Sequence, residues 1–256
     1  MCELCNLDLA STAGQATDEQ SREVLAALGS ALVRNDRVAR RNRDYLDLYG
    51  VTAINLISTP RAGKTSLLES TIPTLIRDYR IAVVASDLAA DEDVRRLRAL
   101  GVPTIQVMTG TARHLDAHML TRALRDIVTP ELDLLFMESD GNLTCPASLS
   151  LGQHHNVALL SVPDGDDRPQ REPALFRAAD LVLLTKTDLL AGARHLQSPW
   201  HRHRCVLRMA ARQGSVAILA RRFAQSWTAA AAARQPVGSL QLRVQLIGKP
   251  AVAAFQ

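Results

Sequence analysis

The chain has 256 residues, of which 47% are hydrophobic and 22% are charged, and its formal net charge at pH 7 is +4. This length and composition are typical of one globular α/β domain with extensions. The longest apolar runs are too short to span a bilayer, and no charged segment precedes an apolar one near the N-terminus, so we expect no membrane partner and a cytoplasmic location. The basic residues lack interleaved aromatic residues, which argues against nucleic-acid binding.

The N-terminal residues suggest two segments. Residues 1–16 are small and polar, and we expect a flexible segment carrying Cys2-x-x-Cys5. In a cytosolic chain this spacing favours a metal or redox pair over a disulfide, although two thiolates do not complete a four-coordinate site. From Asp18 to about Tyr49 an apolar stripe predicts one amphipathic helix or two, forming an N-terminal helical segment over 17–50.

Strand-like runs then alternate with helical patterns, and several are apolar on nearly every residue. Such runs are typical of strands covered by helices on both faces. The pattern predicts an α/β fold with a doubly wound, mostly parallel sheet, in a domain over 51–235. An alanine-rich helix is expected near 214–234, and a half-exposed strand near 240–246 in a C-terminal extension, 236–256. The seven runs are 51–57, 81–86, 104–108, 132–137, 157–162, 181–185 and 205–209.

The stretch STPRAGKT, residues 58–65, resembles a phosphate-binding loop and lies between a predicted strand and a predicted helix. That context separates real from accidental matches to G-x-x-x-x-G-K-S/T. Lys64 would bridge the terminal phosphates and the Thr65 hydroxyl would bind Mg²⁺, with an ordinary strand-to-helix turn as the alternative. The residues expected at the nucleotide are Ser58, Arg61, Ala62, Gly63, Lys64, Thr65 and Ser66.

Ser58 stands where the usual pattern has its first glycine, and Arg61, a bulky cation, lies where the backbone normally comes close to phosphate. If position 61 needs a positive φ, an arginine there introduces strain of about 1 kcal/mol or more. A guanidinium near the phosphates would offset part of that cost through a charge-assisted contact. We expect a loop that binds nucleotide more weakly than the usual pattern does, and we leave open whether the nucleotide is hydrolysed.

Two further strand ends carry polar residues suited to a nucleotide. Glu138 follows the apolar run 132–137, where its carboxylate can hold the magnesium shell or position a water, and Gly141 can turn an amide toward a γ-phosphate. Lys186 and Asp188 in LLTKTDLL suit recognition of guanine, with Thr185 where asparagine is usual. Adenine would leave the Asp188 carboxylate unpaired, which discriminates against ATP. A helix cap at Asp188 is the alternative for that stretch alone.

With these residues in hand, the chain closely resembles the HypB family of hydrogenase nickel-insertion GTPases, from about residue 30 to about residue 228. NDRVARRNRDYLDLYGVTAINLISTP, HLDAHML, GNLTCPASLSLG and ALFRAADLVLLTKTDLL carry the likeness. The resemblance implies a P-loop NTPase of the SIMIBI type that binds GTP with Mg²⁺, dimerises on nucleotide binding and hydrolyses GTP slowly. It also implies a role in delivering nickel to the large subunit of nickel–iron hydrogenase, together with a small zinc-binding partner protein.

The resemblance assigns further residues. Asp87 would lie in the switch segment approaching Mg²⁺, Glu138 at the Walker B position, and Ala211 in the guanine loop, which here lacks its serine. The family's Cys-His metal pair reads Arg113-His114, while Cys145-Pro146 is intact. His114 and Cys145 from two protomers would still give a four-coordinate site for Ni²⁺ or Zn²⁺ at the dimer interface. A helix-terminal histidine and a buried thiol are the alternatives.

Two other functions stay open. The substitutions at Arg61, Arg113 and the guanine loop, and Leu7 in the N-terminal cysteine motif, also fit a divergent paralogue that serves as a nucleotide-dependent scaffold or regulator of hydrogenase assembly. An ATP-dependent small-molecule kinase is the third, and Asp188 argues against it. The GTPase is favoured because Lys64, Thr65, Asp87, Glu138, Lys186 and Asp188 are all retained.

Overall fold

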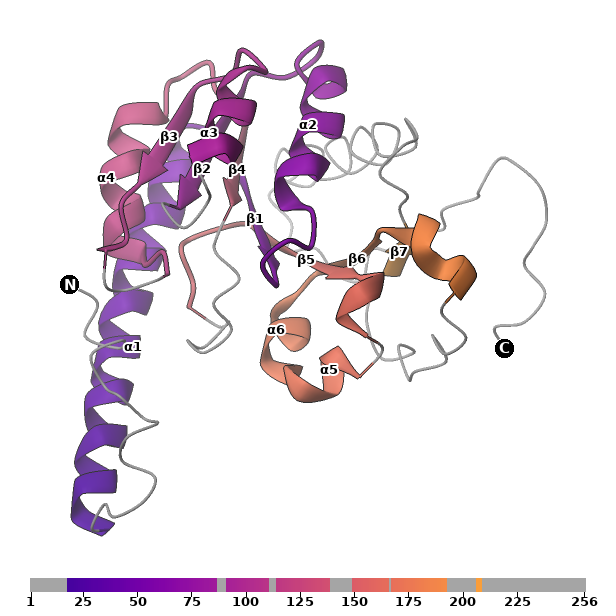
Figure 1. The fold of residues 1–256 in the computed structure, drawn as a ribbon. Helices are drawn as coiled ribbons and strands as arrows, with labels where there is room; N and C mark the ends of the chain where they lie inside the picture. Colours follow the sequence, from indigo (N-terminus) through magenta and orange to yellow (C-terminus); the bar gives the residue numbers. More distant parts are fainter. Residues whose placement is uncertain are drawn as a thin grey trace.

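The computed structural model of the protein describes residues 18–86, 91–110, 114–138, 149–165, 167–192 and 206–208. Within these residues, seven strands form one sheet in the order β3-β2-β4-β1-β5-β6-β7, with every pair parallel (Figure 1). All seven predicted strands are confirmed. They are β1 (Thr52–Ser58), β2 (Ile81–Ser86), β3 (Thr104–Val107), β4 (Leu134–Glu138), β5 (His155–Ser161), β6 (Leu181–Thr185) and β7 (Val206–Arg208).

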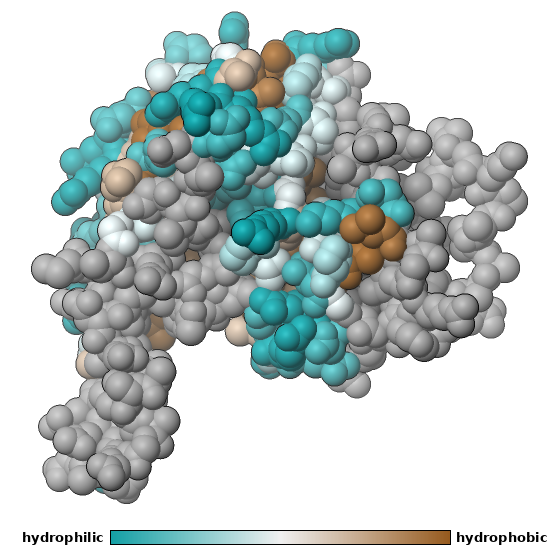
Figure 2. All heavy atoms as spheres, viewed as in Figure 1, coloured by the Kyte–Doolittle hydropathy of each residue, from teal (hydrophilic) through white to brown (hydrophobic). Residues whose placement is uncertain are grey.

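Helices cover both faces of the sheet, so the doubly wound α/β prediction is confirmed. Successive side chains of β1 point to opposite faces of the sheet, and both faces are apolar. Ile54 and Leu56 pack in one core cluster, while Ala53 packs in the other. The first cluster is completed by α2 (Lys64–Leu75) and α3 (Asp91–Arg98), and the second by α1 (Asp18–Leu48) and α4 (Ala117–Ile127). The outer surface over α3 is hydrophilic (Figure 2).

Shorter helices follow the last buried strands. The single turn η2 (Val162–Asp164) leads into α5 (Arg168–Arg171) and α6 (Pro173–Ala178), and η3 (Thr187–Gly192) follows β6. Leu175 and Phe176 of α6 pack against β5 and β6 in a third apolar cluster. Several predictions lie outside the described residues: Cys2, Cys5, Asp87, Gly141, Cys145, Ala211, the helix near 214–234 and the strand near 240–246.

Helix α1 forms as one continuous helix, which resolves the choice between one helix and two. Buried asparagines hold it on the domain. Asn42 Nδ2 donates to the carbonyls of Ala117, at 2.8 Å, and Leu151, at 3.0 Å. Asn35 Nδ2 donates to the Ser150 carbonyl at 2.8 Å, while its Oδ1 accepts the Ala117 N–H at 3.0 Å. Because buried polar groups are costly when unpaired, these bonds fix where α1 can dock.

Two neighbouring histidines, His154 and His155, have structural roles at the start of β5. His154 Nδ1 accepts the Ala53 N–H at 3.0 Å, and its Nε2 lies 2.8 Å from Asp47 Oδ1, which ties α1 to β1 and β5. His155 begins β5, 3.9 Å from the Asp180 carboxylate. Burial lowers the pKa of His155 to about 4, helped by the nearby His154 and Arg43. Burial also lowers the pKa of His154, and Arg43 adds to this lowering.

The lowered pKa values of His154 and His155 predict that the folded chain loses stability in mild acid. A histidine whose pKa is lower in the folded chain takes up its proton more readily when unfolded, so the free energy of unfolding falls as the pH drops from about 6.5 toward about 4. Replacing His155 with glutamine should reduce that loss by about 1–2 kcal/mol, measured by urea unfolding at pH 7 and pH 5. His118→Gln, at an exposed histidine, is the control. Identical pH dependence in wild type and His155→Gln would contradict this account.

Candidate functional site

Four parallel strands end together at one edge of the sheet, and their last residues are polar. β1 ends at Ser58, β4 at Glu138, β5 at Ser161 and β6 at Thr185. The strand register brings these ends to the same level, because Leu56 pairs with Glu138 and Ser161 pairs with Thr185. In open parallel sheets this carboxyl edge is where ligands bind.

The loop between β1 and α2 has the geometry of an anion-binding cradle. Gly63, at φ 98°, precedes the first turn of α2, whose N–H groups and positive dipole end favour a negative charge. The Lys64 side chain is buried, and its Nζ donates to Ser58 Oγ at 3.0 Å. Ser58 Oγ in turn donates to the Thr59 carbonyl at 2.8 Å. The serine at position 58 therefore holds the lysine ammonium within the loop.

Thr65 and Glu138, from two different elements, meet at this edge. Thr65 Oγ1 donates to Glu138 Oε1 at 2.8 Å, and both side chains are buried. A hydroxyl and a carboxylate are hard oxygen ligands of the kind that Mg²⁺ prefers. The donor set therefore fits Mg²⁺, and magnesium binding here stays a prediction.

Arg61 adopts a left-handed backbone conformation, the case in which we expected strain at this position. Its φ is 63°, and its side chain is exposed. Only one other described non-glycine residue has a positive φ, Lys186 at 56°, and it lies in the segment expected to recognise guanine. Strained backbone of this kind is concentrated at functional sites.

The backbone strain at Arg61 predicts the direction in which a glycine substitution changes the stability of the chain. We expect Arg61→Gly to stabilise the nucleotide-free chain by about 0.5–1 kcal/mol, since a non-glycine residue in this conformation costs about 1–2 kcal/mol and glycine loses part of that gain in unfolded-state entropy. Arg77→Gly is the control, an exposed arginine without a positive φ, where glycine should destabilise. Thermal melting of both variants checks this. A lower melting temperature for Arg61→Gly would contradict the strain.

Thr185 ties the phosphate loop to the end of β6. Its hydroxyl lies 2.7 Å from the Ala62 carbonyl and 3.3 Å from the Leu160 carbonyl, and both atoms are acceptors. We expected this hydroxyl to supply a hydrogen bond to guanine. In the structure its single proton is used inside the protein, so Thr185 couples the two loops of the site.

Lys186 and Asp188 follow directly and face solvent to different degrees. Lys186 is half-buried, and its carbonyl accepts the Leu189 N–H at 3.0 Å. Asp188 is exposed in the first turn of η3. The buried end of β6 thus passes into a turn whose carboxylate is accessible to a ligand.

Asp164 is a site residue to which we assigned no role from the sequence. Its carboxylate accepts the Thr59 hydroxyl at 3.0 Å, and it also accepts the Ser161 N–H at 2.9 Å and the Ser161 hydroxyl at 2.7 Å. The phosphate loop is therefore also tied to the end of β5. The pattern S-x-x-D in SVPD, a capping-box spacing, was the sequence signal available.

Arg168 and Arg171, next to the end of β5, form local ion pairs. Arg168 contacts Glu172 at 2.6 Å, and Arg171 contacts Asp167 at 2.9 Å. Each pair spans four residues of the short α5 region, so much of this charge is compensated locally.

His114 is buried just before α4, whose N-terminus is capped by Asp116 accepting the Met119 N–H at 2.8 Å. Among the described residues, no group of three or more histidine, cysteine, aspartate or glutamate side chains is arranged to hold a metal. The companion cysteines lie outside those residues, so a metal role for His114 stays a prediction.

Residues 53–212 match the family model of the CobW/HypB/UreG nucleotide-binding domain, which covers more than half of the chain. The chain belongs to the CobW/HypB/UreG family. The match begins in β1 and includes the phosphate loop, Thr65, Glu138 and the Lys186–Asp188 turn. None of the described helices is both long enough and apolar enough to cross a membrane.

Individual CobW/HypB/UreG relatives are similar to this chain over more than half of its length. The chain is 48% identical over 159 residues to the hydrogenase maturation factor HypB of Azotobacter chroococcum mcd 1, covering 62% of this chain and 52% of the relative. It is 43% identical to HypB of Escherichia coli (strain K12), covering 66% of this chain and 58% of the relative. The chain thus spans about half the length of the first curated relatives it matches.

Two solved CobW/HypB/UreG structures share the fold. The crystal structure of hydrogenase maturation factor HypB from Archaeoglobus fulgidus has a TM-score of 0.68 at 29% identity, covering 77% of this chain and 99% of that chain. HypB from Helicobacter pylori in complex with nickel also has a TM-score of 0.68 at 29% identity, covering 81% of this chain and 100% of that chain.

Proposed function

We propose that this chain is a GTP-binding and GTP-hydrolysing metallochaperone that assists nickel insertion into nickel–iron hydrogenase. The observation that carries the nucleotide part is the meeting of Thr65 with Glu138 beside the buried Lys64. An ammonium, a magnesium-binding hydroxyl and a carboxylate at the start of a helix are the parts that phosphoryl transfer from a nucleoside triphosphate requires. The family membership of the chain supports the same reading.

Within this proposal the phosphate loop holds the triphosphate. Lys64 would exchange its bond to Ser58 for contacts with the terminal phosphates, and the N–H groups of Ala62, Gly63, Thr65 and Ser66 would donate to phosphate oxygens. The exposed guanidinium of Arg61 would add a cation at the loop surface. Asp164 and Thr185 do not contact nucleotide in this scheme, and instead keep the loop in shape through Thr59 and Ala62.

Mg²⁺ would be held by Thr65, with Glu138 and Asp87 in its coordination shell. The ion would neutralise charge on the phosphate oxygens. Glu138 has a second task in this proposal, because a carboxylate at the end of β4 can orient the attacking water. Guanine would be recognised by the Asp188 carboxylate, with the Lys186 stem along the ring and Gly141 and Ala211 completing the nucleotide site.

Hydrolysis is tested by phosphate release. We expect the full chain to release phosphate slowly from GTP with Mg²⁺, at a rate clearly above that of Lys64→Ala prepared in parallel. Equal rates for the two proteins would show that the chain does not hydrolyse GTP. The alternative function, a nucleotide-dependent scaffold, would then be favoured.

The metal part of the proposal rests on the relatives. The Helicobacter pylori HypB structure contains nickel, and curated relatives are named as hydrogenase maturation factors. We propose that nickel or zinc is carried by His114 and Cys145 of two protomers, that Cys2 and Cys5 contribute a second, weaker site, and that GTP promotes the dimer. The partners would be a small zinc-binding nickel-insertion protein and the hydrogenase large subunit.

Nickel and zinc titration of wild type, Cys145→Ala and Cys2→Ala tests the proposed metal ligands. Unchanged metal affinity in both variants would exclude Cys145 and Cys2 as ligands.

A further inference from the structure

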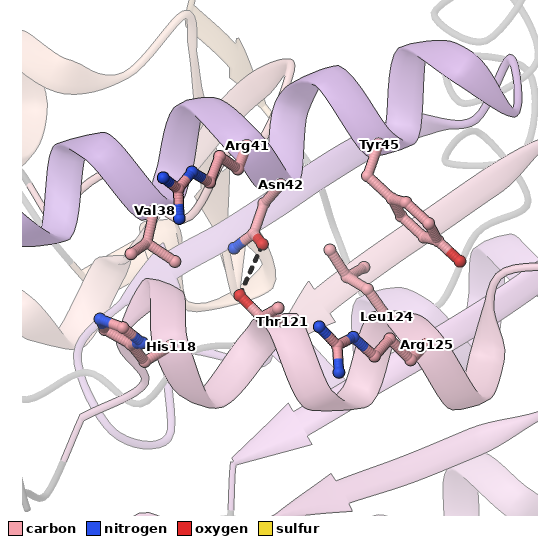
Figure 3. Close-up of a pocket in the computed structure, with 8 residues that line it drawn as sticks. All are labelled: Val38, Arg41, Asn42, Tyr45, His118, Thr121, Leu124 and Arg125. Carbon is pink, nitrogen blue, oxygen red and sulfur yellow. Dashed lines mark hydrogen bonds between the residues drawn. The ribbon is translucent and has the colours of Figure 1, made fainter.

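A groove of about 370 Å³ lies between α1 and α4, on the side of the domain built by the second core cluster (Figure 3). Both helices contribute side chains at seven-residue spacing, so the groove follows them for two helical turns, about 10 Å. It involves none of the residues proposed to bind nucleotide or metal. The lining residues are Val38, Arg41, Asn42, Tyr45, His118, Thr121, Leu124 and Arg125.

The base of the groove is fixed by hydrogen bonds. Thr121 Oγ1 donates to Asn42 Oδ1 at 2.7 Å across the two helices (Figure 3). Asn42 is itself held by its bonds to the carbonyls of Ala117 and Leu151. Leu124 is buried beneath the groove, while Val38 and Tyr45 are half-buried and offer apolar surface to a ligand. A preformed base reduces the entropy lost when a ligand binds.

The rim of the groove is cationic. Arg41 of α1 and Arg125 of α4 are both exposed, and His118 adds a third basic side chain. Within the described residues, neither Arg41 nor Arg125 takes part in an ion pair. Two guanidinium groups that form no ion pair with another described residue, beside apolar surface, favour a ligand that brings both carboxylates and apolar side chains.

The distribution of the basic groups favours a segment of chain over a small anion. His118 lies toward one end of the groove and Arg125 toward the other, and they are separated by two turns of α4 (Figure 3). A small anion requires donors that converge on one point. In the polyproline II conformation, carboxylates three residues apart lie on the same face of a peptide and are separated by about 9 Å, which is close to this spacing.

We propose that this groove binds an acidic segment of a partner protein, which places carboxylates at the Arg41–His118 end and at Arg125 and lays an apolar side chain on Val38 and Tyr45. The occupant is defined by its chemistry: carboxylates three residues apart with an aliphatic side chain between them. Because the groove lies apart from the phosphate loop, its occupancy does not require GTP to be bound.

Fluorescence anisotropy with a short labelled peptide that repeats Glu-Leu-Ser tests the proposal on the full chain. We expect saturable binding that weakens with added salt, and a loss of about tenfold or more in affinity for Arg41→Glu/Arg125→Glu. The matched control is Arg77→Glu/Arg98→Glu, which makes the same charge change at exposed arginines outside the groove and should bind nearly as wild type. The Gln-Leu-Ser version of the peptide should bind at least tenfold more weakly, by about 1.4 kcal/mol.

Several outcomes would overturn the proposal. Equal losses in the two double variants would reduce the binding to general charge attraction. Displacement of the labelled peptide by inorganic tripolyphosphate at the same concentration as unlabelled peptide would make the groove a small-anion site. Displacement by a peptide of residues 1–17, which carry Glu3 and Asp8 and no lysine or arginine, would assign it to this chain's own N-terminal segment. Arg41→Gln/Arg125→Gln repeats the test if charge reversal lowers the melting temperature.

Discussion

Replacing Lys64 with alanine is expected to weaken GTP binding about 100-fold or more. The ammonium is buried in the phosphate loop and is held by Ser58 Oγ at 3.0 Å, so it is already positioned where a triphosphate would lie. Hydrogen bonds to charged groups contribute about 1.5–3 kcal/mol each, and two such contacts to phosphate oxygens give about 3 kcal/mol or more. Isothermal titration of wild type and Lys64→Ala with a slowly hydrolysed GTP analogue and Mg²⁺ measures this loss.

Two controls make the Lys64 result specific. Lys64→Arg keeps the charge but introduces a planar fork into a space that holds a compact ammonium, so we expect an intermediate loss. Ser66→Ala changes an exposed side chain of the first turn of α2, and its backbone N–H remains, so its effect should be small. An affinity for Lys64→Ala within about twofold of wild type would mean that the triphosphate does not lie at this loop.

The second large effect is on stability and concerns Gly152, in the segment against which α1 docks. A Cβ at this position would lie 2.6 Å from the Ala39 carbonyl oxygen and 2.9 Å from the Arg43 amide nitrogen, and φ is +97°. Both neighbouring atoms belong to the backbone of α1, so the helix itself would have to move. Overpacking and left-handed strain together predict that Gly152→Ala lowers the free energy of unfolding by about 3 kcal/mol or more.

Three glycine variants separate the causes. Gly29→Ala adds a methyl group within α1 where nothing lies within 4 Å, and should stabilise by about 0.5–1 kcal/mol. Gly50→Ala has open space but a φ of +70°, and should cost about 1 kcal/mol from strain alone. Urea unfolding of the three variants gives the order. If Gly152→Ala cost no more than Gly50→Ala, the close approach of α1 to this segment would be wrong.

The strands were predicted well from the sequence because each is marked by a short apolar run of neighbouring residues. Runs such as Leu134–Met137 are apolar on both faces, and only a strand covered on both sides explains that pattern. The approach of Thr65 to Glu138 was also predictable, because a phosphate loop after one strand and a carboxylate after another must meet at the carboxyl edge of a parallel sheet.

Other features depend on tertiary contacts that no spacing encodes. Asn35 and Asn42 read as polar residues of a helix surface, yet both are buried and hold α1 on the domain. His154 pairs with Asp47 and with the Ala53 amide, residues more than 100 positions away, so its structural role was not visible in the sequence. Thr185 was expected beside the guanine base, but its hydroxyl bonds to the Ala62 carbonyl. A hydroxyl donates to the nearest suitable acceptor, and the sequence does not show which carbonyl lies nearest in the packed chain.

Calorimetric titration of the full chain with GTP and with ATP, each with Mg²⁺, tests most directly whether this site recognises a guanine nucleotide. The account predicts saturable binding of GTP, binding of ATP weaker by about tenfold or more, and loss of that preference in Asp188→Ala. Equal affinity for the two nucleotides, or heat from neither in a chain that melts cooperatively, would contradict it.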